Sequence, residues 1–186
     1  MRKLIVGVSG ASGTAYAYAA LRALRAHDDI EIHLVLSAQA SHTLALETDL
    51  TVEDLTALAH VVYDDGDLGA AISSGSFITS GMLVIPCSMR SASAIAHSLN
   101  ANLLVRAADV CLKERRPLVL VVRETPLHLG HLRTLVHLAE IGAVLLPPMP
   151  AMYARPKTID DVIAHTVGKA LDQFAIPNDL FNRWPG

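Results

Sequence analysis

The residues from 3 to 14 constrain the fold more than any other stretch of the chain. An apolar run over residues 4–8 is typical of a strand buried on both faces of a parallel sheet. Residues 9–13 are all small, so backbone amides can approach a ligand there without side chains in the way. An Ala- and Leu-rich helix is predicted from about residue 13 to 26. Its N-terminal amides are expected to face an anion above the turn, most naturally a phosphate.

Two interpretations of this turn remain open on local grounds. The glycine spacing fits neither the dinucleotide-binding pattern nor the P-loop with its Lys-Ser or Lys-Thr pair. A turn of small residues also serves simply to pack a strand against a helix. The rest of the chain must therefore decide between phosphate binding and packing.

Composition bounds the class of protein. The chain has 186 residues, of which 52% are apolar and 18% charged, so we expect one tightly packed domain over residues 1–186. A net charge of −3 argues against nucleic acid or an acidic membrane surface as a partner. Cys87 and Cys111 form no CxxC pair, and no run of about 18 apolar residues occurs. We expect a soluble, cytoplasmic protein with neither a disulfide framework nor a zinc site, and with Cys111 in a helix core.

Strands and helices alternate along the chain. Further strands are predicted at about 31–37, 82–85, 118–122 and 143–146. Helices are predicted at about 39–47, 91–99, 102–114, 128–141 and 158–174, with a short one after Thr51 that carries Leu55, Leu58 and Val61. Asp64, Asp65 and Asp67 are predicted to form a solvated loop. This alternation indicates a three-layer α/β fold, a Rossmann-like or flavodoxin-like parallel sheet with helices on both faces.

Polar or small residues follow the predicted strands where each one ends. They lie at residues 9–13, at Ser37, at 88–91 and at 123–124. Open α/β sheets bind ligands at the carboxyl ends of their strands. We therefore expect a binding site at this edge.

Several motifs in fixed order resemble the UbiX family over nearly the whole chain. These are GxSGASG at 7–13, LETD at 46–49, SGSF at 74–77, PCSMRS at 86–91, RAADVCLKERRPL at 106–118, RETPL at 123–127 and YARP at 153–156. The resemblance implies a flavin prenyltransferase that joins the dimethylallyl group of dimethylallyl phosphate to N5 and C6 of reduced FMN, without a metal. It also implies a homo-dodecamer whose product, prenylated FMN, serves a UbiD-type decarboxylase, including one that acts on the ubiquinone precursor.

The same resemblance implies roles for individual residues. The FMN site would comprise Gly10, Ala11, Ser12, Ser37, Ser88, Met89, Arg90, Ser91 and Arg123. Tyr153 and Lys169 would hold dimethylallyl phosphate, with Arg106, Lys113 and Trp184 lining the same region. Glu124 is our candidate for proton transfer, assisted by Ser12, with Glu47 as a secondary candidate. The family often has lysine at position 90 and arginine at position 169, which changes hydrogen-bond geometry but not charge.

Simpler interpretations stand beside these roles. Arg123 and Glu124 could form an ion pair, and Arg115 and Arg116 could form a solvated helix end. His128, with His131, His137 and Glu140, has a spacing that permits a metal but lacks the HExxH pattern. Cys87 is expected to pack rather than to act as a nucleophile.

Two alternative functions remain open at this point. One is an FMN-dependent cysteine decarboxylase of the same fold, and the other is a non-catalytic flavin-binding subunit of a decarboxylase. The first would be expected to carry a Pro-x-Met-Asn segment, where this chain has Pro-Ala-Met-Tyr at 150–153.

Overall fold

The computed structural model describes residues 1–184, and these form a single parallel sheet flanked by helices. The order across the sheet is β3-β2-β1-β4-β5-β6, and every neighbouring pair is parallel. The expected parallel α/β sheet is confirmed. The strands are β1 (Arg2–Val8), β2 (Ile30–Leu36), β3 (Val61–Asp64), β4 (Met82–Cys87), β5 (Leu118–Val122) and β6 (Val144–Leu145).

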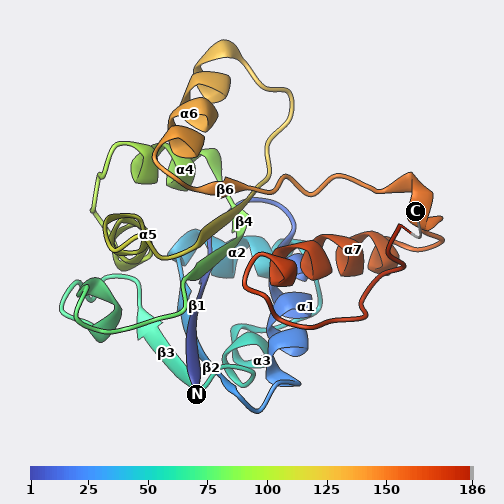
Figure 1. The fold of residues 1–186 in the computed structure, drawn as a ribbon, viewed down its shortest axis with the longest axis horizontal. Helices are drawn as coiled ribbons and strands as arrows, with labels where there is room; N and C mark the ends of the chain where they lie inside the picture. Colours follow the sequence, from blue (N-terminus) through green and yellow to red (C-terminus); the bar gives the residue numbers. More distant parts are fainter. Residues whose placement is uncertain (185–186) are drawn as a thin grey trace.

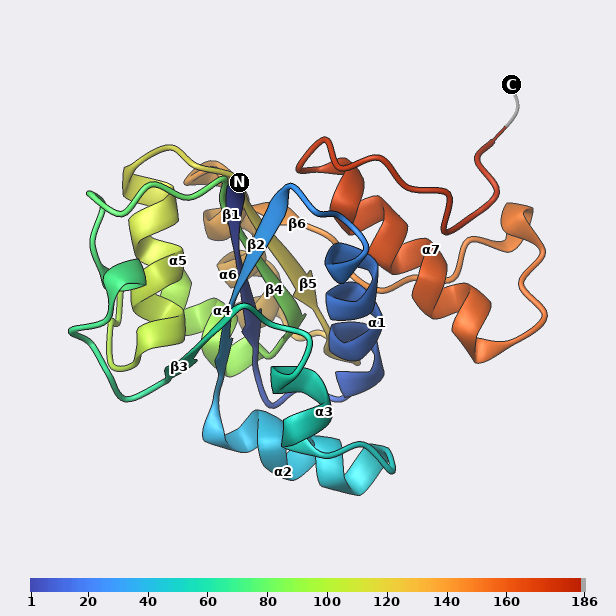
Figure 2. The same ribbon diagram turned by 90° about the horizontal axis from the view of Figure 1, so that it is seen from below.

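Helices cover both faces of the sheet, giving three layers (Figures 1 and 2). The helices α1, α2, α3 and α7 contribute to one core cluster, and α4, α5 and α6 to the other. Their bounds are α1 (Thr14–Arg25), α2 (Ala38–Glu47), α3 (Val52–Thr56), α4 (Met89–Ala96), α5 (Leu103–Lys113), α6 (Leu129–Glu140) and α7 (Ile159–Asp172), with short 3₁₀ turns η1 (Ala71–Ser73) and η2 (Met152–Ala154).

The central strands are buried on both sides because side chains alternate between the two faces. In β4, Leu83 and Ile85 pack under α1 and α7, whereas Met82 and Val84 pack under α4 and α5. All four are fully buried. Cys111 lies in the second core, as expected from the sequence.

The sequence prediction missed strand β3. Val61 was expected to belong to the helix that carries Leu55, but α3 ends at Thr56 and Val61 pairs with His33 of β2. β3 is a short edge strand whose residues alternate between half-buried and exposed. A strand of this kind has no continuous apolar run, which is the signal that marks the central strands.

Arg116 is not part of a solvated helix end, contrary to the simpler interpretation. Its guanidinium donates to the carbonyl oxygens of Gly75 at 2.6 Å and Phe77 at 2.8 Å. It therefore fastens the loop before β4 to the segment after α5. Arg115, by contrast, is exposed as expected.

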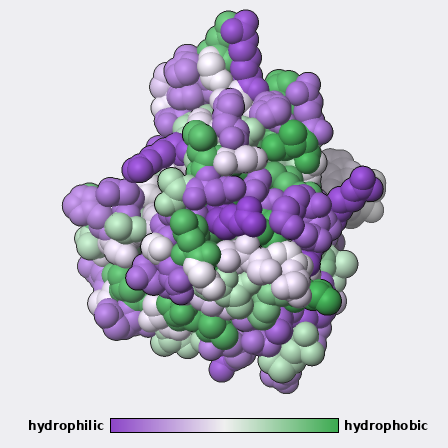
Figure 3. Space-filling model, turned by 90° about the vertical axis from the view of Figure 1, so that its left-hand side faces the viewer, coloured by the Kyte–Doolittle hydropathy of each residue, from purple (hydrophilic) through white to green (hydrophobic). Residues whose placement is uncertain are grey.

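The surface on the side of α5 and β3 is a mosaic of polar and apolar residues, and α6 projects at its top (Figure 3). No helix within residues 1–184 has the length and apolarity needed to cross a membrane.

Gly81 is expected to be indispensable at the start of β4. Its φ is +131°, and an added Cβ would lie 2.4 Å from the carbonyl oxygen of Pro117, the acceptor for Met82 N–H. Gly142 is the matched control, because its φ is +103° but an added Cβ would meet nothing within 4 Å. Both Gly→Ala variants should carry backbone strain of about 1–3 kcal/mol, and Gly81→Ala should lose more because of the clash. Thermal denaturation that finds equal losses in the two variants would contradict this account.

Candidate functional site

The chain reverses its direction across the sheet between β1 and β4. Strands β2 and β3 extend the sheet on one side of β1, whereas β4, β5 and β6 extend it on the other. A crevice forms beyond the carboxyl ends of the strands at such a switch point. A cavity of about 390 Å³ lies at this edge, and Gly10, Ser37, Ser88, Arg90 and Ser91 are among its lining residues.

Three helices begin at this cavity. Ser37, Ser88 and Asn102 are the N-cap residues of α2, α4 and α5, and all three line it. Their side-chain oxygens accept hydrogen bonds from the backbone N–H groups of Ala40, Ser91 and Val105 at 3.0–3.2 Å. Helix N-termini carry partial positive charge, and the exposed Arg90 side chain adds a full one. The cavity therefore suits an anion.

Ser9 joins the two loops that form the floor of this edge. Its hydroxyl donates to the carbonyl oxygen of Pro86 at 2.9 Å and accepts from the N–H of Ser88 at 2.7 Å. Gly10 follows, and a Cβ at this position would lie 2.4 Å from Cβ of Gln39. The absence of a side chain at Gly10 lets the first loop approach α2 closely.

The amides at the start of α1 do not face an open anion site, so that expectation is wrong. Oε2 of Glu47 accepts hydrogen bonds from the N–H groups of Gly13 at 2.8 Å and Thr14 at 3.1 Å, and from the Thr14 hydroxyl at 3.1 Å. Burial raises the pKa of Glu47, but hydrogen bonds from Ser12, Gly13 and Thr14 outweigh it and hold the pKa below its usual value. Glu47 is therefore an ionised cap in contact with Ser12.

Arg123 and Glu124 lie at the same edge, beyond the end of β5. The N–H of Arg123 donates to the carbonyl oxygen of Cys87 at 3.0 Å, which places this residue beside the loop that begins at Ser88. Both side chains are exposed, and the ion pairs found within residues 1–184 do not include one between them. The simple ion-pair interpretation is therefore not supported.

Tyr153, Lys169 and Trp184 form a separate group on the arm, by which we mean residues 147–184. The arm carries η2, α7 and the C-terminal tail. The rings of Tyr153 and Trp184 meet edge to face, with centroids 5.5 Å apart. The Tyr153 hydroxyl lies 3.1 Å from Nε2 of His165 on α7. None of these residues lines the cavity at the strand ends.

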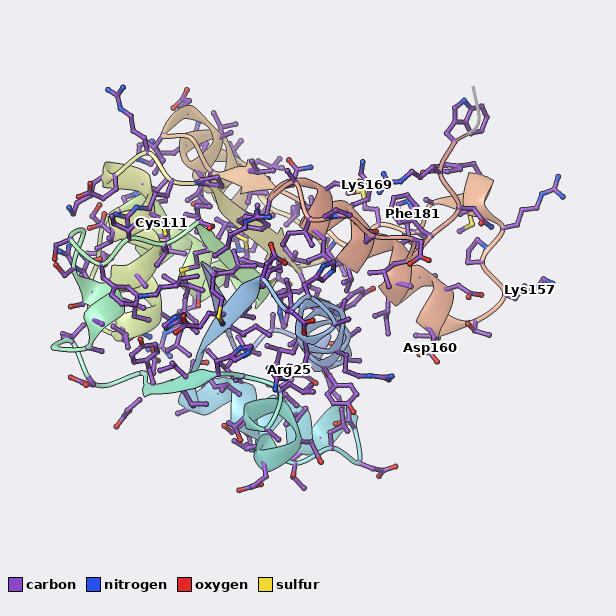
Figure 4. The ribbon with its side chains drawn as sticks, turned by 60° about the horizontal axis from the view of Figure 1, so that its bottom comes forward. Arg25, Cys111, Lys157, Asp160, Lys169 and Phe181 are labelled. Carbon is purple, nitrogen blue, oxygen red and sulfur yellow. The ribbon has the colours of Figure 1, made fainter. Side chains whose placement is uncertain are left out.

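Arg106 and Lys113 lie on α5, on the opposite face of the sheet from α7. Arg106 donates to the carbonyl oxygen of Ser73 at 3.1 Å and pairs with Asp109 at 3.1 Å, while Lys113 pairs with its neighbour Glu114. Figure 4 shows Cys111 of α5 and Lys169 of α7 on opposite sides of the molecule. A single chain therefore does not bring all the predicted substrate residues together.

Four cavity residues, Ala38, Gln39, Asp65 and Asn102, escaped the sequence prediction. Asp65, expected in a solvated loop, is half-buried and lines the cavity together with Asn102. Its carboxylate accepts hydrogen bonds from Asn102 Nδ2 and Leu104 N–H, each at 2.9 Å, so it holds the start of α5. Burial raises the pKa of Asp65. The sequence carried no local signal of this role, because β3, the strand before the acidic loop, was itself missed and the contact of Asp65 with Asn102 spans 37 residues.

The remaining reactive side chains have structural surroundings. Burial raises the pKa of the Cys87 thiol to about 12, so this residue packs as expected. His128 caps α6 by accepting from the N–H of Gly130 at 3.0 Å. Among residues 1–184, no cluster of three or more His, Cys, Asp and Glu side chains is placed to hold a metal ion.

Both the sequence and the fold of this chain are similar to those of characterised proteins. The model of the Flavoprotein family matches residues 1–171. Flavin prenyltransferase UbiX of Escherichia coli K12 is 59% identical over the whole of both chains. The dodecameric FMN-dependent UbiX-like decarboxylase of Escherichia coli O157:H7 superposes with a TM-score of 0.97 at 47% identity, covering 99% of this chain and 100% of that one.

A second solved structure is equally similar in fold. AnUbiX (PadA1), in complex with FMN and dimethylallyl pyrophosphate, superposes with a TM-score of 0.97 at 44% identity, covering 100% of this chain and 98% of that one. The alignment with the relatives spans the full length of the chain. Its sequence identity is well above the level at which two proteins share only a fold. The chain thus belongs to the Flavoprotein family and, within it, to the UbiX family of flavin prenyltransferases.

Proposed function

We propose that this protein transfers the dimethylallyl group of dimethylallyl phosphate to N5 and C6 of reduced FMN. The convergence of the N-termini of α2 and α4 with Arg90 on one cavity at the strand ends carries this proposal. The cavity suits a flavin mononucleotide because the phosphate needs a local positive site in a chain whose net charge is −3. Full-length relatives named as flavin prenyltransferases support the same activity.

The FMN phosphate is held where α2 and α4 begin. Ser37, Ser88, Ser91 and Arg90 supply hydroxyl groups, backbone amides and a guanidinium there. Residues 10–12 would contact the rest of the flavin, with Gly10 letting this loop pack closely against α2, and Arg123 would contact it from the end of β5. Met89, buried at the first turn of α4, supports the loop without offering a charge.

The donor is held by cations and a phenol hydroxyl. As the bond between the allylic carbon and the phosphate oxygen breaks, negative charge grows on the leaving phosphate. Lys169, Tyr153 and Arg123 stabilise that charge, and Arg106 and Lys113 line the same region. Trp184 and the ring of Tyr153 contact the apolar five-carbon group.

Proton transfer is assigned to Glu124, the carboxylate just beyond the end of β5. Reduced FMN supplies the nucleophilic N5 and C6 atoms. One proton leaves N5 and one leaves C6 as the two new bonds form, and one proton adds to the alkene carbon C2 of the allyl group so that C3 can bond to C6. Glu124 is exposed at the same strand edge as the cavity, so it can accept a proton, with Ser12 orienting the acceptor. Glu47 supports the site indirectly, because its carboxylate holds Ser12 and the first amides of α1 through hydrogen bonds.

Assembly of several copies completes the site. Within one chain, three parts of the site lie apart: the arm with Tyr153, the cavity at the strand ends, and the α5 cations Arg106 and Lys113. Large apolar side chains are exposed on α6 and on the arm, among them Leu129 at 60%, Met149 at 70% and Met152 at 72%. Such exposure favours burial between subunits, and one solved structure of this fold is dodecameric. The arm of one subunit therefore contributes to the strand-end cavity of another.

Prenylated FMN is a cofactor in its own right, so a separate UbiD-type decarboxylase consumes it. Both cysteines are free and buried, which suits the reducing cytoplasm, where reduced flavin is also available.

The activity is tested by mass spectrometry. Purified protein incubated without oxygen with reduced FMN and dimethylallyl phosphate should yield a flavin heavier by one five-carbon unit, together with free phosphate. A parallel reaction with the diphosphate donor identifies the preferred leaving group. Recovery of unaltered FMN from both reactions would contradict the proposed activity and favour a flavin carrier, whereas decarboxylation of a cysteine substrate would favour the alternative enzyme.

Arg90→Ala should weaken FMN binding by about tenfold to a hundredfold while leaving riboflavin binding unchanged. The guanidinium meets only the phosphate, which riboflavin lacks, and charge-assisted hydrogen bonds of this kind contribute about 1.5–3 kcal/mol. Flavin fluorescence titration measures both affinities. Arg133→Ala, an exposed arginine on α6, is the control and should alter neither. An equal loss for both flavins would remove Arg90 from the phosphate site.

Glu124→Gln should bind FMN normally but lose turnover by about a hundredfold or more, because the amide keeps the shape but cannot accept the proton. Glu140→Gln is the matched control, since Glu140 is an exposed carboxylate at the end of α6. Anaerobic single-turnover kinetics with both variants provide the measurement. Turnover that survives Glu124→Gln unchanged would assign proton transfer to another group.

A further inference from the structure

One carboxylate, Asp172, ties the C-terminal tail to the last turn of α7. Its two oxygens accept from the two terminal nitrogens of Arg183 at 2.9 Å and 2.7 Å, which is the bidentate geometry of a strong charge pair. Asn178 Nδ2 donates to the same carboxylate at 3.1 Å. Hydrogen bonds from Arg183 hold the pKa of Asp172 below its usual value, so the carboxylate stays ionised.

Asp172 also meets Lys169, the predicted donor-binding cation. Lys169 Nζ lies 3.8 Å from Oδ2 of Asp172. His165, Lys169 and Asp172 are spaced four and three residues apart, which places them along one face of α7. Figure 4 shows Lys169 and Phe181 on the same side of the molecule, where the tail runs beside α7.

Aromatic contacts extend this attachment to Trp184. The Phe181 ring meets the His165 ring edge to face, with centroids 4.6 Å apart, and it rests on Gly168, where an added Cβ would lie 2.5 Å from Phe181. His165 reaches the Tyr153 hydroxyl, and Trp184 packs against the Tyr153 ring at 5.5 Å. Trp184 itself is 68% exposed, so packing alone holds it weakly, and the Arg183–Asp172 pair anchors the residue just before it.

We infer that Asp172 is a positioning residue for the isoprenoid donor, acting through Arg183 to hold Trp184 against Tyr153 and through Lys169 to hold its ammonium on the same side. The group so formed has an apolar corner beside a cation and a hydroxyl. That chemistry matches a small alkyl phosphate, whose five-carbon chain and phosphate need opposite surroundings. The inference rests on the proposed function for the identity of the donor, but the attachment of the tail is independent of it.

Trp184 is the only tryptophan in the chain, so its fluorescence reports the tail directly. In the full-length assembly, Asp172→Asn should shift Trp184 emission to longer wavelength and increase its quenching by acrylamide. Arg183→Leu should do the same, and the double variant should be no worse than either single one, because both remove one pair. Asp160→Asn is the control, being an exposed carboxylate at the other end of α7, and should leave the emission unchanged.

Donor binding is measured without turnover. Titration of the oxidised, FMN-loaded protein with dimethylallyl phosphate should give a dissociation constant about tenfold higher in Asp172→Asn than in the unaltered protein. Affinity for FMN should change less than twofold, whereas general misfolding would weaken both. Unchanged Trp184 emission, additive effects in the double variant, or equal losses for FMN and donor would overturn the inference. Failure of the unaltered protein to bind the donor while the emission responds to Asp172→Asn would refute the donor assignment alone.

Discussion

Parallel pairing of every strand decides where the helices of this protein begin. Strands β1, β2 and β4 each deliver the chain to the same edge of the sheet, so the helices that follow them, α1, α2 and α4, start there with N–H groups that lack a partner within the helix. Ser37 and Ser88 each accept one of these N–H groups, in α2 and α4, whereas the first N–H groups of α5 are all taken by Asp65 and Asn102. The positive potential of the site therefore comes from the starts of α2 and α4, with Arg90 as the one cationic side chain in a lining that also contains the Asp65 carboxylate.

Carboxylates restrict where an anion can bind at this edge. Glu47 takes the first amides of α1, and Asp65 takes an amide of α5. Repulsion by these two groups leaves the region between α2 and α4 as the most favourable for a phosphate, beside Arg90. In the proposed function, the ribityl chain and ring of the flavin would extend across residues 10–12 toward Arg123 and Glu124.

Most of the fold could be predicted from the sequence because the central strands are continuous apolar runs. The edge strand β3 could not, since a half-exposed strand of four residues has no such run. The strand-end site was predicted from small and polar residues after each strand. The roles of Glu47 as a helix cap and Asp65 as a cavity residue depend on contacts over 33 and 39 residues of sequence, which no local pattern records. The separation of Tyr153 from the cavity likewise depends on how the arm leaves the sheet.

The central claim is that helices α2 and α4 grip the phosphate of a flavin mononucleotide at the switch point of the sheet. A crystal structure of the protein with FMN tests it most directly. The account predicts phosphate density within hydrogen-bond distance of Ser37, Ser88 and Arg90, with Tyr153 of a neighbouring subunit facing the flavin ring. Phosphate density at the start of α1, or a flavin bound away from the strand ends, would contradict it.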